Sequence, residues 1–271
     1  MSSRHRVRVF GLPVWLDVGR LLGPGTWRTV TDADGTLSAE AELTREVGAD
    51  LEARLRGVGL AGNALATEIT PPLSRANVRA ARSAEARRHR EGSPGLTRPG
   101  ARFDAEARRS LTPEALALAI GERARGLSVL DAGCGAGGNA IGFARAGCAV
   151  TAIELDGGRL SMARHNAGLY GVADRIRFIA GDADELVPSL NADLLFIDPP
   201  WGADYDKRRV ELADLPLLST LVAHRARFAR VWVKVPPSFD PKSLPGARPE
   251  AFFGVGAGDA QRVKFLLLEL R

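Results

Sequence analysis

Four short motifs place acidic, glycine and aromatic residues where strands are expected to end. In the first, Val129–Asn139, an apolar run passes through Asp131 into Gly133, Gly135 and Gly137, and a helix is expected to follow. Glycines allow a ligand to approach the backbone closely, and the first turn of a helix offers free N–H groups. The spacing G-x-G-x-G differs from the dinucleotide pattern G-x-G-x-x-G. A lone glycine-rich turn is a weak signal, so the neighbouring strands matter.

The next two motifs place single carboxylates after two further apolar runs. Glu154 ends the run that begins at Ala149, about twenty residues after the glycines, where an acidic residue typically binds a ribose diol. Asp182 follows the run 176–180. Each motif alone could be an ordinary turn or helix cap. The three in order predict a site for a nucleoside-type cofactor.

The fourth motif joins a buried run, 194–197, to Asp198, Pro199, Pro200 and Trp201. An exocyclic or amide amine is a poor nucleophile because its lone pair is delocalised. A carboxylate and a carbonyl that accept its N–H groups would direct the lone pair towards an electrophile. The prolines would fix that carbonyl because their φ is locked, and the indole offers a stacking surface. The competing interpretation is a rigid turn after a buried strand.

The elements that must hold these motifs alternate between strand and helix patterns from Leu127 onwards. The predicted strands are 128–132, 149–153, 176–180, 194–197, 231–235 and 262–270, and the predicted helices are 139–146, 156–168 and 215–229. Such alternation predicts an α/β fold, a Rossmann-like parallel sheet with helices on both faces. Lys234 lies in one of these strands and is predicted to reach the substrate side. Thr112 is predicted to cap a helix that begins at Pro113.

The first hundred residues follow another pattern and predict a smaller, partly helical module, separate from a domain over 101–271. A short strand is expected at Arg6–Phe10, a helix from Ser38 to about Leu60, and a second helix from Arg75 to about Arg90. Residues 91–100 have the composition of a linker.

Positive charge is concentrated before the motifs. The 271 residues carry 37 Lys and Arg against 32 Asp and Glu, a net charge of +5, and only four of the bases are lysines. Residues 1–125 hold the whole excess, with 20 Arg against 15 acids, and residues 75–109 alone hold ten Arg against four acids. A GC-rich genome or a solvated helix face would explain arginine in general. The local excess favours contact with an RNA backbone, with Arg82, Arg87 and Arg88 as candidates.

Composition excludes several other classes of protein. Apolar residues make up 45% of the chain, as in globular proteins, and no run of eighteen apolar residues exists. We therefore expect no membrane partner. The start of the chain does not resemble a signal peptide, and Cys134 and Cys148 cannot form a disulfide framework or a four-ligand zinc site. We expect a cytoplasmic protein with no metal.

Taken together, the motifs resemble the class I S-adenosylmethionine-dependent methyltransferases with an Asp/Asn/Ser-Pro-Pro-aromatic motif. Within them the chain is most similar to the trimethylguanosine synthases, the RNA cap guanine-N2 methyltransferases. The similarity extends from Arg102 to about Asp206. It rests on the stretches 102–104, 112–114, 136–139, 163–167, 170–174 and 198–202. Family members commonly have a second glycine after Trp-Gly, whereas this chain has Ala203.

The resemblance implies a role for each motif. The cofactor would be S-adenosylmethionine, with its methionine part against the Asp131–Gly137 turn, its ribose on Glu154 and its adenine on Asp182. Thr112 and Asn139 would complete the cofactor site. Asp198 and the Pro199 carbonyl would hold the target amine, and Trp201 would stack on the base.

Three functions remain open from the sequence. The first is methylation of an exocyclic amine, guanine N2 of an RNA in particular. Because the arginine-rich chain looks bacterial, a ribosomal or transfer RNA guanine, or a free nucleotide-like molecule, fits better than a cap. The second is methylation of an amine in a small molecule or a protein. The third is RNA binding without catalysis, against which the intact motifs argue. The sequence does not indicate an oligomeric state.

Overall fold

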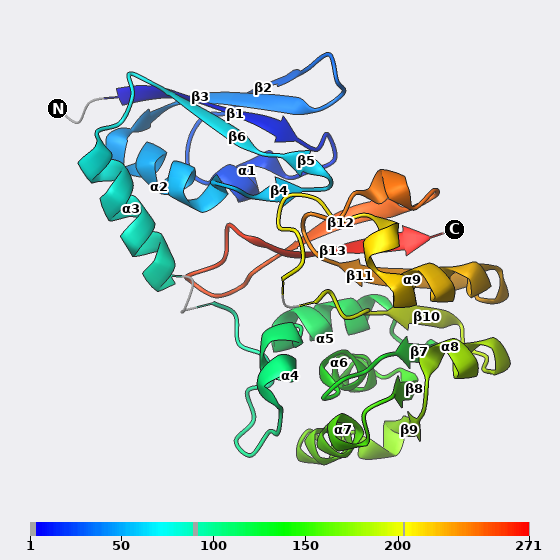
Figure 1. Ribbon diagram of the computed structural model, residues 1–271. Helices are drawn as coiled ribbons and strands as arrows, with labels where there is room; N and C mark the ends of the chain where they lie inside the picture. Colours follow the sequence, from blue (N-terminus) through cyan, green and yellow to red (C-terminus); the bar gives the residue numbers. More distant parts are fainter. Residues whose placement is uncertain (1–3, 89–91, 203, 271) are drawn as a thin grey trace.

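The computed structural model describes residues 4–88, 92–202 and 204–270 (Figure 1). Three predicted features fall outside these residues: the end of the second helix at Arg90, the start of the linker at Glu91, and Ala203. The chain forms a small antiparallel sheet from its amino-terminal part and a large sheet from the remainder.

The large sheet has seven strands in the order β12-β13-β11-β10-β7-β8-β9. Their bounds are β7 (Ser128–Ala132), β8 (Ala149–Glu154), β9 (Ile176–Ala180), β10 (Leu194–Ile197), β11 (Arg230–Val235), β12 (Arg248–Phe253) and β13 (Val263–Leu270). The five strands from β9 to β11 are parallel to one another, and β13 runs antiparallel between β11 and β12. The predicted α/β fold is confirmed. Strand β12 was not predicted from the sequence.

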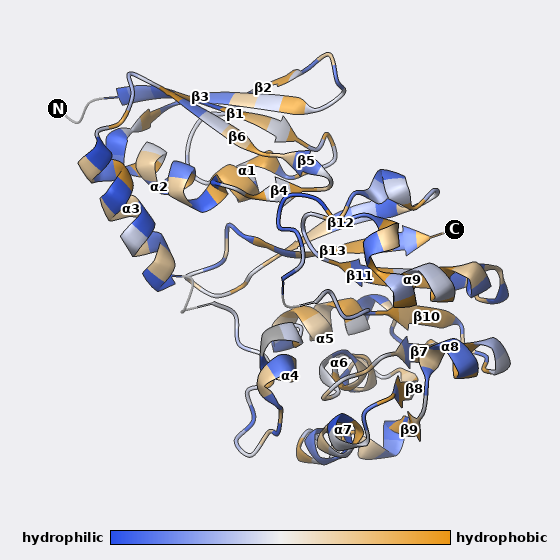
Figure 2. Ribbon diagram, viewed as in Figure 1, coloured by the Kyte–Doolittle hydropathy of each residue, from blue (hydrophilic) through white to orange (hydrophobic). Residues whose placement is uncertain are grey.

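Helices cover both faces of this sheet (Figure 1). Helices α5 (Glu114–Arg123), α6 (Gly138–Arg145) and α7 (Gly157–Leu169) lie on one face, and α8 (Ala183–Leu186) and α9 (Pro216–Leu221) lie on the other. All four residues of β10 are buried, which explains the unbroken apolar run in the sequence (Figure 2). This layering leaves the loops at the carboxyl ends of the strands free to form a site.

The start of α5 differs from the prediction. Pro113 occupies the N-cap position rather than the first turn, and the Thr112 side chain caps no helical N–H group. The Glu114 N–H group donates instead to the carbonyl of Pro94, 3.0 Å away, and the Leu116 and Ala117 N–H groups bond to the Pro113 carbonyl. The predicted cap at Thr112 is therefore wrong.

The amino-terminal part is richer in strands than predicted. Its sheet has the order β2-β3-β1-β6, from β1 (Arg4–Leu12), β2 (Arg28–Thr31), β3 (Leu37–Thr44) and β6 (Ala66–Thr70). Beside it lie α1 (Val18–Leu22), α2 (Arg45–Leu55), α3 (Arg75–Arg88) and the ribbon of β4 (Gly59–Leu60) and β5 (Asn63–Ala64), while α4 (Ala105–Ser110) precedes α5.

The predicted helix from Ser38 to Leu60 is wrong over its first third, which is strand β3, and at its end, because α2 stops at Leu55 and Gly59–Leu60 is strand β4. Ala39, Ala41 and Leu43 are buried and alternate with more exposed residues, which is the period of a strand. The helix begins only after Thr44, whose hydroxyl accepts the N–H of Val47. Apolar residues at positions 43, 47, 51 and 55 have the four-residue spacing of a helix, and this pattern concealed the change of period.

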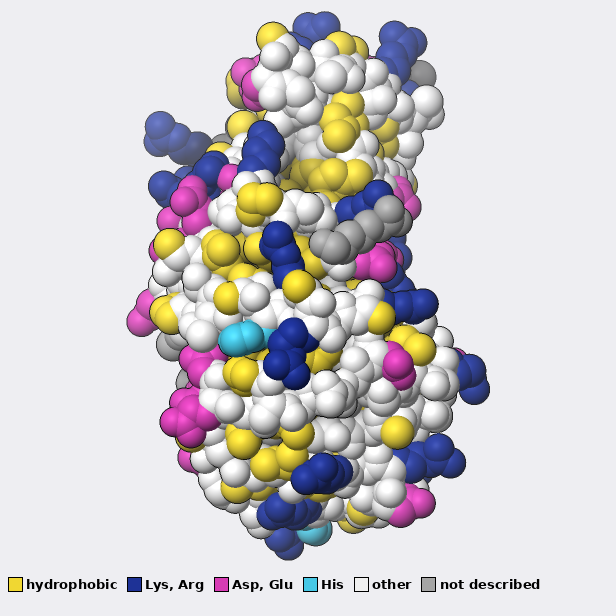
Figure 3. All heavy atoms as spheres, turned by 90° about the vertical axis from the view of Figure 1, so that its right-hand side faces the viewer, with side chains coloured by type: hydrophobic (Ala, Val, Ile, Leu, Met, Phe, Trp, Pro, Cys, Tyr) yellow, Lys and Arg dark blue, Asp and Glu magenta, His cyan; other side chains and the backbone are white. Residues whose placement is uncertain are grey.

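The arginine-rich helix α3 lies against α2 at the edge of the molecule and is hydrophilic over most of its length (Figures 1 and 2). Two of its arginines form ion pairs with α2: Arg82 with Glu52 at 3.2 Å, and Arg88 with Asp50. Arg87 is exposed. On the face shown in Figure 3, Lys and Arg side chains are scattered rather than gathered in one patch. Arg82 and Arg88 thus link α3 to α2 within the amino-terminal part.

Candidate active site

The four motifs meet at the carboxyl edge of the large sheet, because the strands they follow, β9, β8, β7 and β10, are neighbours in that order. Hydrogen bonds hold the turns in register: the N–H groups of Gly133 and Cys134 donate to the Ile153 carbonyl at 3.1 and 2.8 Å. The Gly181 N–H group donates to the Glu154 carbonyl at 3.1 Å. The cofactor motifs predicted from the sequence are therefore adjacent in space.

The turn after β7 requires glycine. Gly133, Gly135 and Gly137 have φ values of 90°, 56° and 92°, in a region that favours glycine. A Cβ atom at Gly135 would meet nothing within 4 Å, and one at Gly133 would meet only the Asp198 carbonyl, at 3.8 Å. The space above the turn, towards Asp198, is therefore open to a ligand.

Asp131 lies beneath this turn and is fully buried. Neither of its carboxylate oxygens has a hydrogen-bond partner of ordinary geometry among the described residues. Burial raises its pKa to about 8, and the negative charges of Asp198 and Glu154 add to the effect, while Lys234 opposes it. A cationic ligand beside this buried carboxyl group would favour its ionised form.

Glu154 and Asp182 orient their carboxylates through backbone N–H groups. The two oxygens of Glu154 accept from Gly135 and Asp156, at 2.8 and 2.9 Å. Asp182 caps α8 by accepting from Asp184 with one oxygen, at 2.9 Å. These bonds fix both side chains beside the glycine turn, as the predicted ribose and adenine contacts require.

Asp198 follows β10 and is held by two neighbours. Its Oδ2 atom accepts from Lys234 Nζ at 2.7 Å and from Asn139 Nδ2 at 2.9 Å. Lys234 comes from the adjacent strand β11 and is only 3% exposed. Both bonds fall on Oδ2, so Oδ1 stays available to accept a proton from a substrate. The sequence predicted Asp198 and Lys234 separately but not that they form an ion pair.

Trp201 lies beside this pair. Lys234 Nζ is 4.9 Å from the centre of its ring, and Tyr205 meets the ring edge-on at 5.8 Å. The Trp201 Nε1 atom is buried and has no hydrogen-bond partner among the described residues. Within the same loop Pro199 is buried and Pro200 is exposed. Tyr205 was not identified from the sequence because no motif includes it.

The observed residues fit S-adenosylmethionine. An open glycine turn, an unpartnered buried carboxyl group and two oriented acids lie at the same edge of the sheet, and a sulfonium carries positive charge. Asp131, the glycines, Glu154 and Asp182 would hold it. Asn139 contacts Asp198, and the buried Thr112 hydroxyl, which has no partner among the described residues, lies near the start of α6.

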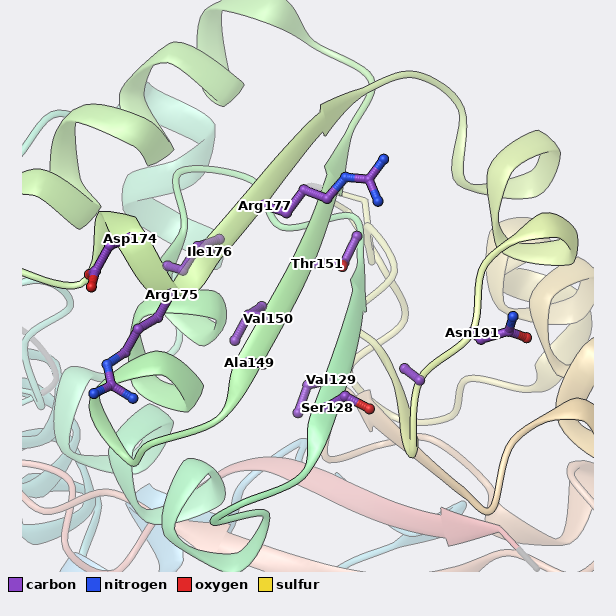
Figure 4. A pocket seen from close by; sticks show the side chains of 11 residues that line it. Ser128, Val129, Ala149, Val150, Thr151, Asp174, Arg175, Ile176, Arg177 and Asn191 are labelled. Atoms are coloured by element: carbon purple, nitrogen blue, oxygen red, sulfur yellow. The ribbon is translucent and has the colours of Figure 1, made fainter.

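Other features do not form a second catalytic cluster. A hollow of about 420 Å³ lies at the opposite edge of the sheet, lined by the amino-terminal ends of β7, β8 and β9; Arg175 and Arg177 point away from each other there (Figure 4). Cys134 and Cys148 are buried free thiols, and burial raises the pKa of each. Among the described residues no His, Cys, Asp or Glu cluster could hold a metal ion, and no helix could cross a membrane.

The sheet and the residues at its carboxyl edge have the arrangement expected of a class I S-adenosylmethionine-dependent methyltransferase. Comparison with known proteins agrees. Residues 127–216, about a third of the chain, match the family model described as RNA cap guanine-N2 methyltransferase.

Two curated relatives and one solved structure illustrate the similarity. Trimethylguanosine synthase of Schizosaccharomyces pombe is 39% identical over 103 residues, covering 34% of this chain and 43% of that protein. Ribosomal RNA small subunit methyltransferase J of Rhodopseudomonas palustris is 32% identical over 148 residues, covering 47% and 66%. An RNA methyltransferase from Salinibacter ruber, solved with S-adenosyl-L-homocysteine, aligns with a TM-score of 0.41 and 20% identity, covering 58% and 88%. The chain spans less than two thirds of the length of these two curated relatives.

The buried Asp131 predicts an unusual dependence of stability on pH. Its folded pKa of about 8 lies above the unfolded value of about 3.9, so the folded protein retains a proton that the unfolded chain releases. The free energy of unfolding without cofactor should therefore fall as the pH rises from about 4 to about 8. Asp131→Asn should remove this loss, and the variant should gain up to a few kcal/mol relative to wild type between pH 5 and pH 8.

Urea denaturation of both proteins at pH 5 and pH 8 measures this change. Asp193→Asn is the control, because Asp193 is an exposed carboxylate with a lowered pKa at the other end of β10. An Asp131→Asn variant whose stability parallels wild type at both pH values would show that Asp131 is ionised in the folded protein.

Proposed function

We propose that this protein transfers a methyl group from S-adenosylmethionine to the exocyclic amine N2 of a guanine in RNA. The observation that carries the proposal is the Asp198-Pro-Pro-Trp loop, which places a carboxylate with one free oxygen beside an indole ring at the open side of the cofactor turn. The match of residues 127–216 to guanine-N2 methyltransferases supports the same substrate.

The residues at this loop act on the amine in a defined way. Asp198 Oδ1 and the Pro199 carbonyl accept the two N–H groups of the amine, which turns its lone pair towards the methyl group that the bound cofactor supplies. Lys234 and Asn139 hold Asp198 through Oδ2, so the acceptor does not reorganise during the reaction. As the N–C bond forms, the amine releases one proton, which Asp198 Oδ1 is placed to accept in this proposal. Alignment and exclusion of water provide the catalysis.

The surroundings of Trp201 favour an uncharged base. Lys234 Nζ already lies 4.9 Å from the ring centre, so one face of the indole carries a cation. A second cation on the other face, such as an N7-methylated cap guanine, would meet π-electron density that already interacts with the Lys234 ammonium, and the two cations would repel each other. An uncharged guanine stacks on the indole without this repulsion. We therefore infer an internal guanine of RNA rather than a cap.

The amino-terminal part is proposed to contact RNA, with residues 1–100 as a module beside the domain 101–271. Arg87 on α3 is exposed and faces no carboxylate among the described residues within ion-pair distance. Arg82 and Arg88 remain candidates for phosphate contacts, although each forms an ion pair with α2. RNA is then the partner, and the location proposed is the cytoplasm.

A second candidate is methylation of an amide or amine in a protein. Release factor glutamine methyltransferase of Chlorobaculum tepidum is 39% identical to this chain over 80 residues, covering 27% of each. The carboxylate and carbonyl would hold an amide as they would hold a base amine. This candidate assigns no role to the arginines of α3.

Incubation with methyl-labelled cofactor separates the two candidates. Purified protein is given total RNA in one reaction and total protein in another, and each product is treated with nuclease or protease. We expect label that nuclease releases and protease does not. Label confined to protein would favour the second candidate, and the triple variant Arg82→Ala, Arg87→Ala, Arg88→Ala should then retain full activity.

A further inference from the structure

A cavity of about 230 Å³ lies where the amino-terminal part meets the large-sheet domain. The end of α2 and the turn that follows it form one wall, and the loop from Tyr205 to Lys207 forms another. The segment 261–263 closes the third side. Elements from both parts of the chain therefore build this cavity.

Its charged side chains are all cationic. Arg54, Arg56, Lys207 and Arg262 line the cavity, and no acidic residue within 4–88, 92–202 or 204–270 does. Arg54 is 8% exposed and is held by backbone carbonyls: Nη1 donates to Leu21 and to Gln261, the latter at 3.1 Å. The Nε atoms of Arg54 and Arg262 are buried and have no hydrogen-bond partner among the described residues. Two arginines of the cavity lining thus each have an N–H donor without an acceptor.

The carboxylates that form ion pairs with these arginines do not balance their positive charge. Asp50 is 4.0 Å from Arg54 Nε, Glu52 is 3.6 Å from Arg56, and Glu85 pairs with Arg262. The same three acids also pair with Arg82 and Arg88 of α3. Five arginines therefore share three carboxylates, and Lys207 forms an ion pair with none of the three. Burial lowers the pKa of Arg54 to about 10; the charge of Asp50 opposes this shift, and those of Arg262 and Arg88 add to it.

Tyr205 links this cavity to the base-stacking side of the active site. It lines the cavity, and its ring meets Trp201 edge-on at 5.8 Å. A polynucleotide whose base lies at Trp201 carries its phosphates within a few bonds of that base. Because Tyr205 borders both the cavity and Trp201, a phosphate near that base would have the cationic cavity close by.

We propose that the cavity lined by Arg54, Arg56, Lys207 and Arg262 binds a phosphate of the RNA strand that presents its guanine to Trp201. This inference rests on the proposed function and assigns the amino-terminal part a contact close to the reaction. It differs from the expectation based on α3, where Arg82 and Arg88 already face carboxylates. Arg82 and Arg88 of α3 then form ion pairs with the acids that also pair with the cavity arginines, and the cavity itself contacts RNA.

RNA binding tests the proposal independently of methyl transfer. The variant Arg56→Met, Lys207→Met removes two exposed cations of the cavity and spares Arg54, which holds the end of α1. The control Arg28→Met, Lys242→Met removes the same charge at exposed positions outside the cavity. Fluorescence anisotropy with a guanine-containing single-stranded RNA, at several salt concentrations, measures the dissociation constant and its salt slope. Calorimetry with S-adenosyl-L-homocysteine checks that the cofactor site stays intact.

We expect the cavity variant to weaken RNA binding about tenfold and to reduce the salt slope by about 1, more than the control does. Equal effects of the two variants would overturn the cavity as a phosphate site and leave the proposed function standing. Guanosine 5′-monophosphate and guanosine form a second arm. If wild type binds the monophosphate but no RNA, and the cavity variant loses the monophosphate, the phosphate comes from a free nucleotide. That result would overturn both the RNA source and the proposed RNA function.

Discussion

Replacing Asp198 by Asn should lower kcat by at least 10²–10³-fold, on the scale of losing one preorganised electrostatic contact in an active site. The variant keeps the size of the side chain but loses the negative charge that draws the amine lone pair towards the methyl group. It also loses the ionic bond to Lys234, 2.7 Å away. Cofactor affinity, measured by calorimetry, should stay within a few fold of wild type because the glycine turn, Glu154 and Asp182 are unchanged.

Asp193→Asn provides the matched control for this prediction. Asp193 precedes β10 as Asp198 follows it, and its carboxylate accepts from the backbone and hydroxyl of Ser128 at the opposite edge of the sheet. This control should lose little activity. Normal turnover by Asp198→Asn would show that the loop does not act through its carboxylate.

Replacing Lys234 by Met should give the largest loss of stability. Lys234 is 3% exposed, and the side chain of Asp198 is 13% exposed, so the remaining carboxylate would be left largely buried and without its cation. Breaking such a pair by removing one partner costs about 3–5 kcal/mol. The loss of Lys234 also removes a charge that lowers the pKa of Asp131, so Asp131 should hold its proton more strongly. Urea denaturation at pH 7 measures the change in the free energy of unfolding.

Two further variants separate the ion pair from a simple loss of packing. Lys242→Met removes an exposed lysine and should alter stability by no more than about 0.5 kcal/mol. The double variant Lys234→Met, Asp198→Leu should recover much of the lost stability, because no charge is then left unpaired. If the double variant is as unstable as Lys234→Met, the loss comes from packing and the ion pair contributes little.

The large sheet was predictable because its signals are local. Each strand of the run from β7 to β11 is a short apolar segment with a clear end, and the glycines after β7 have positive φ values that few other residues adopt. The helix predicted over 156–168 is found at Gly157–Leu169. Motifs at strand ends lie together whenever the strands are parallel and adjacent, so the cofactor side followed from the order of the motifs.

The amino-terminal part was less predictable because its signals conflict. The four-residue spacing of the apolar residues 43, 47, 51 and 55 favoured a helix. The alternation of Ala39, Ala41 and Leu43 with more exposed residues favoured a strand. Tertiary pairing with β1 decides the outcome, and no local pattern reports it. The Lys234–Asp198 ion pair and the cationic cavity were hidden for the same reason, since each joins residues far apart in the sequence.

The position of the methyl group in the product tests the central claim most directly. RNA modified by the protein is digested to nucleosides, which are separated and identified by mass spectrometry against standards. We expect N2-methylguanosine in RNA treated with wild type or Asp193→Asn, and no N2-methylguanosine in RNA treated with Asp198→Asn. Methyl groups on a ring nitrogen, on a base carbon or on ribose would contradict this prediction, since the roles proposed for Asp198 and Pro199 require an exocyclic amine.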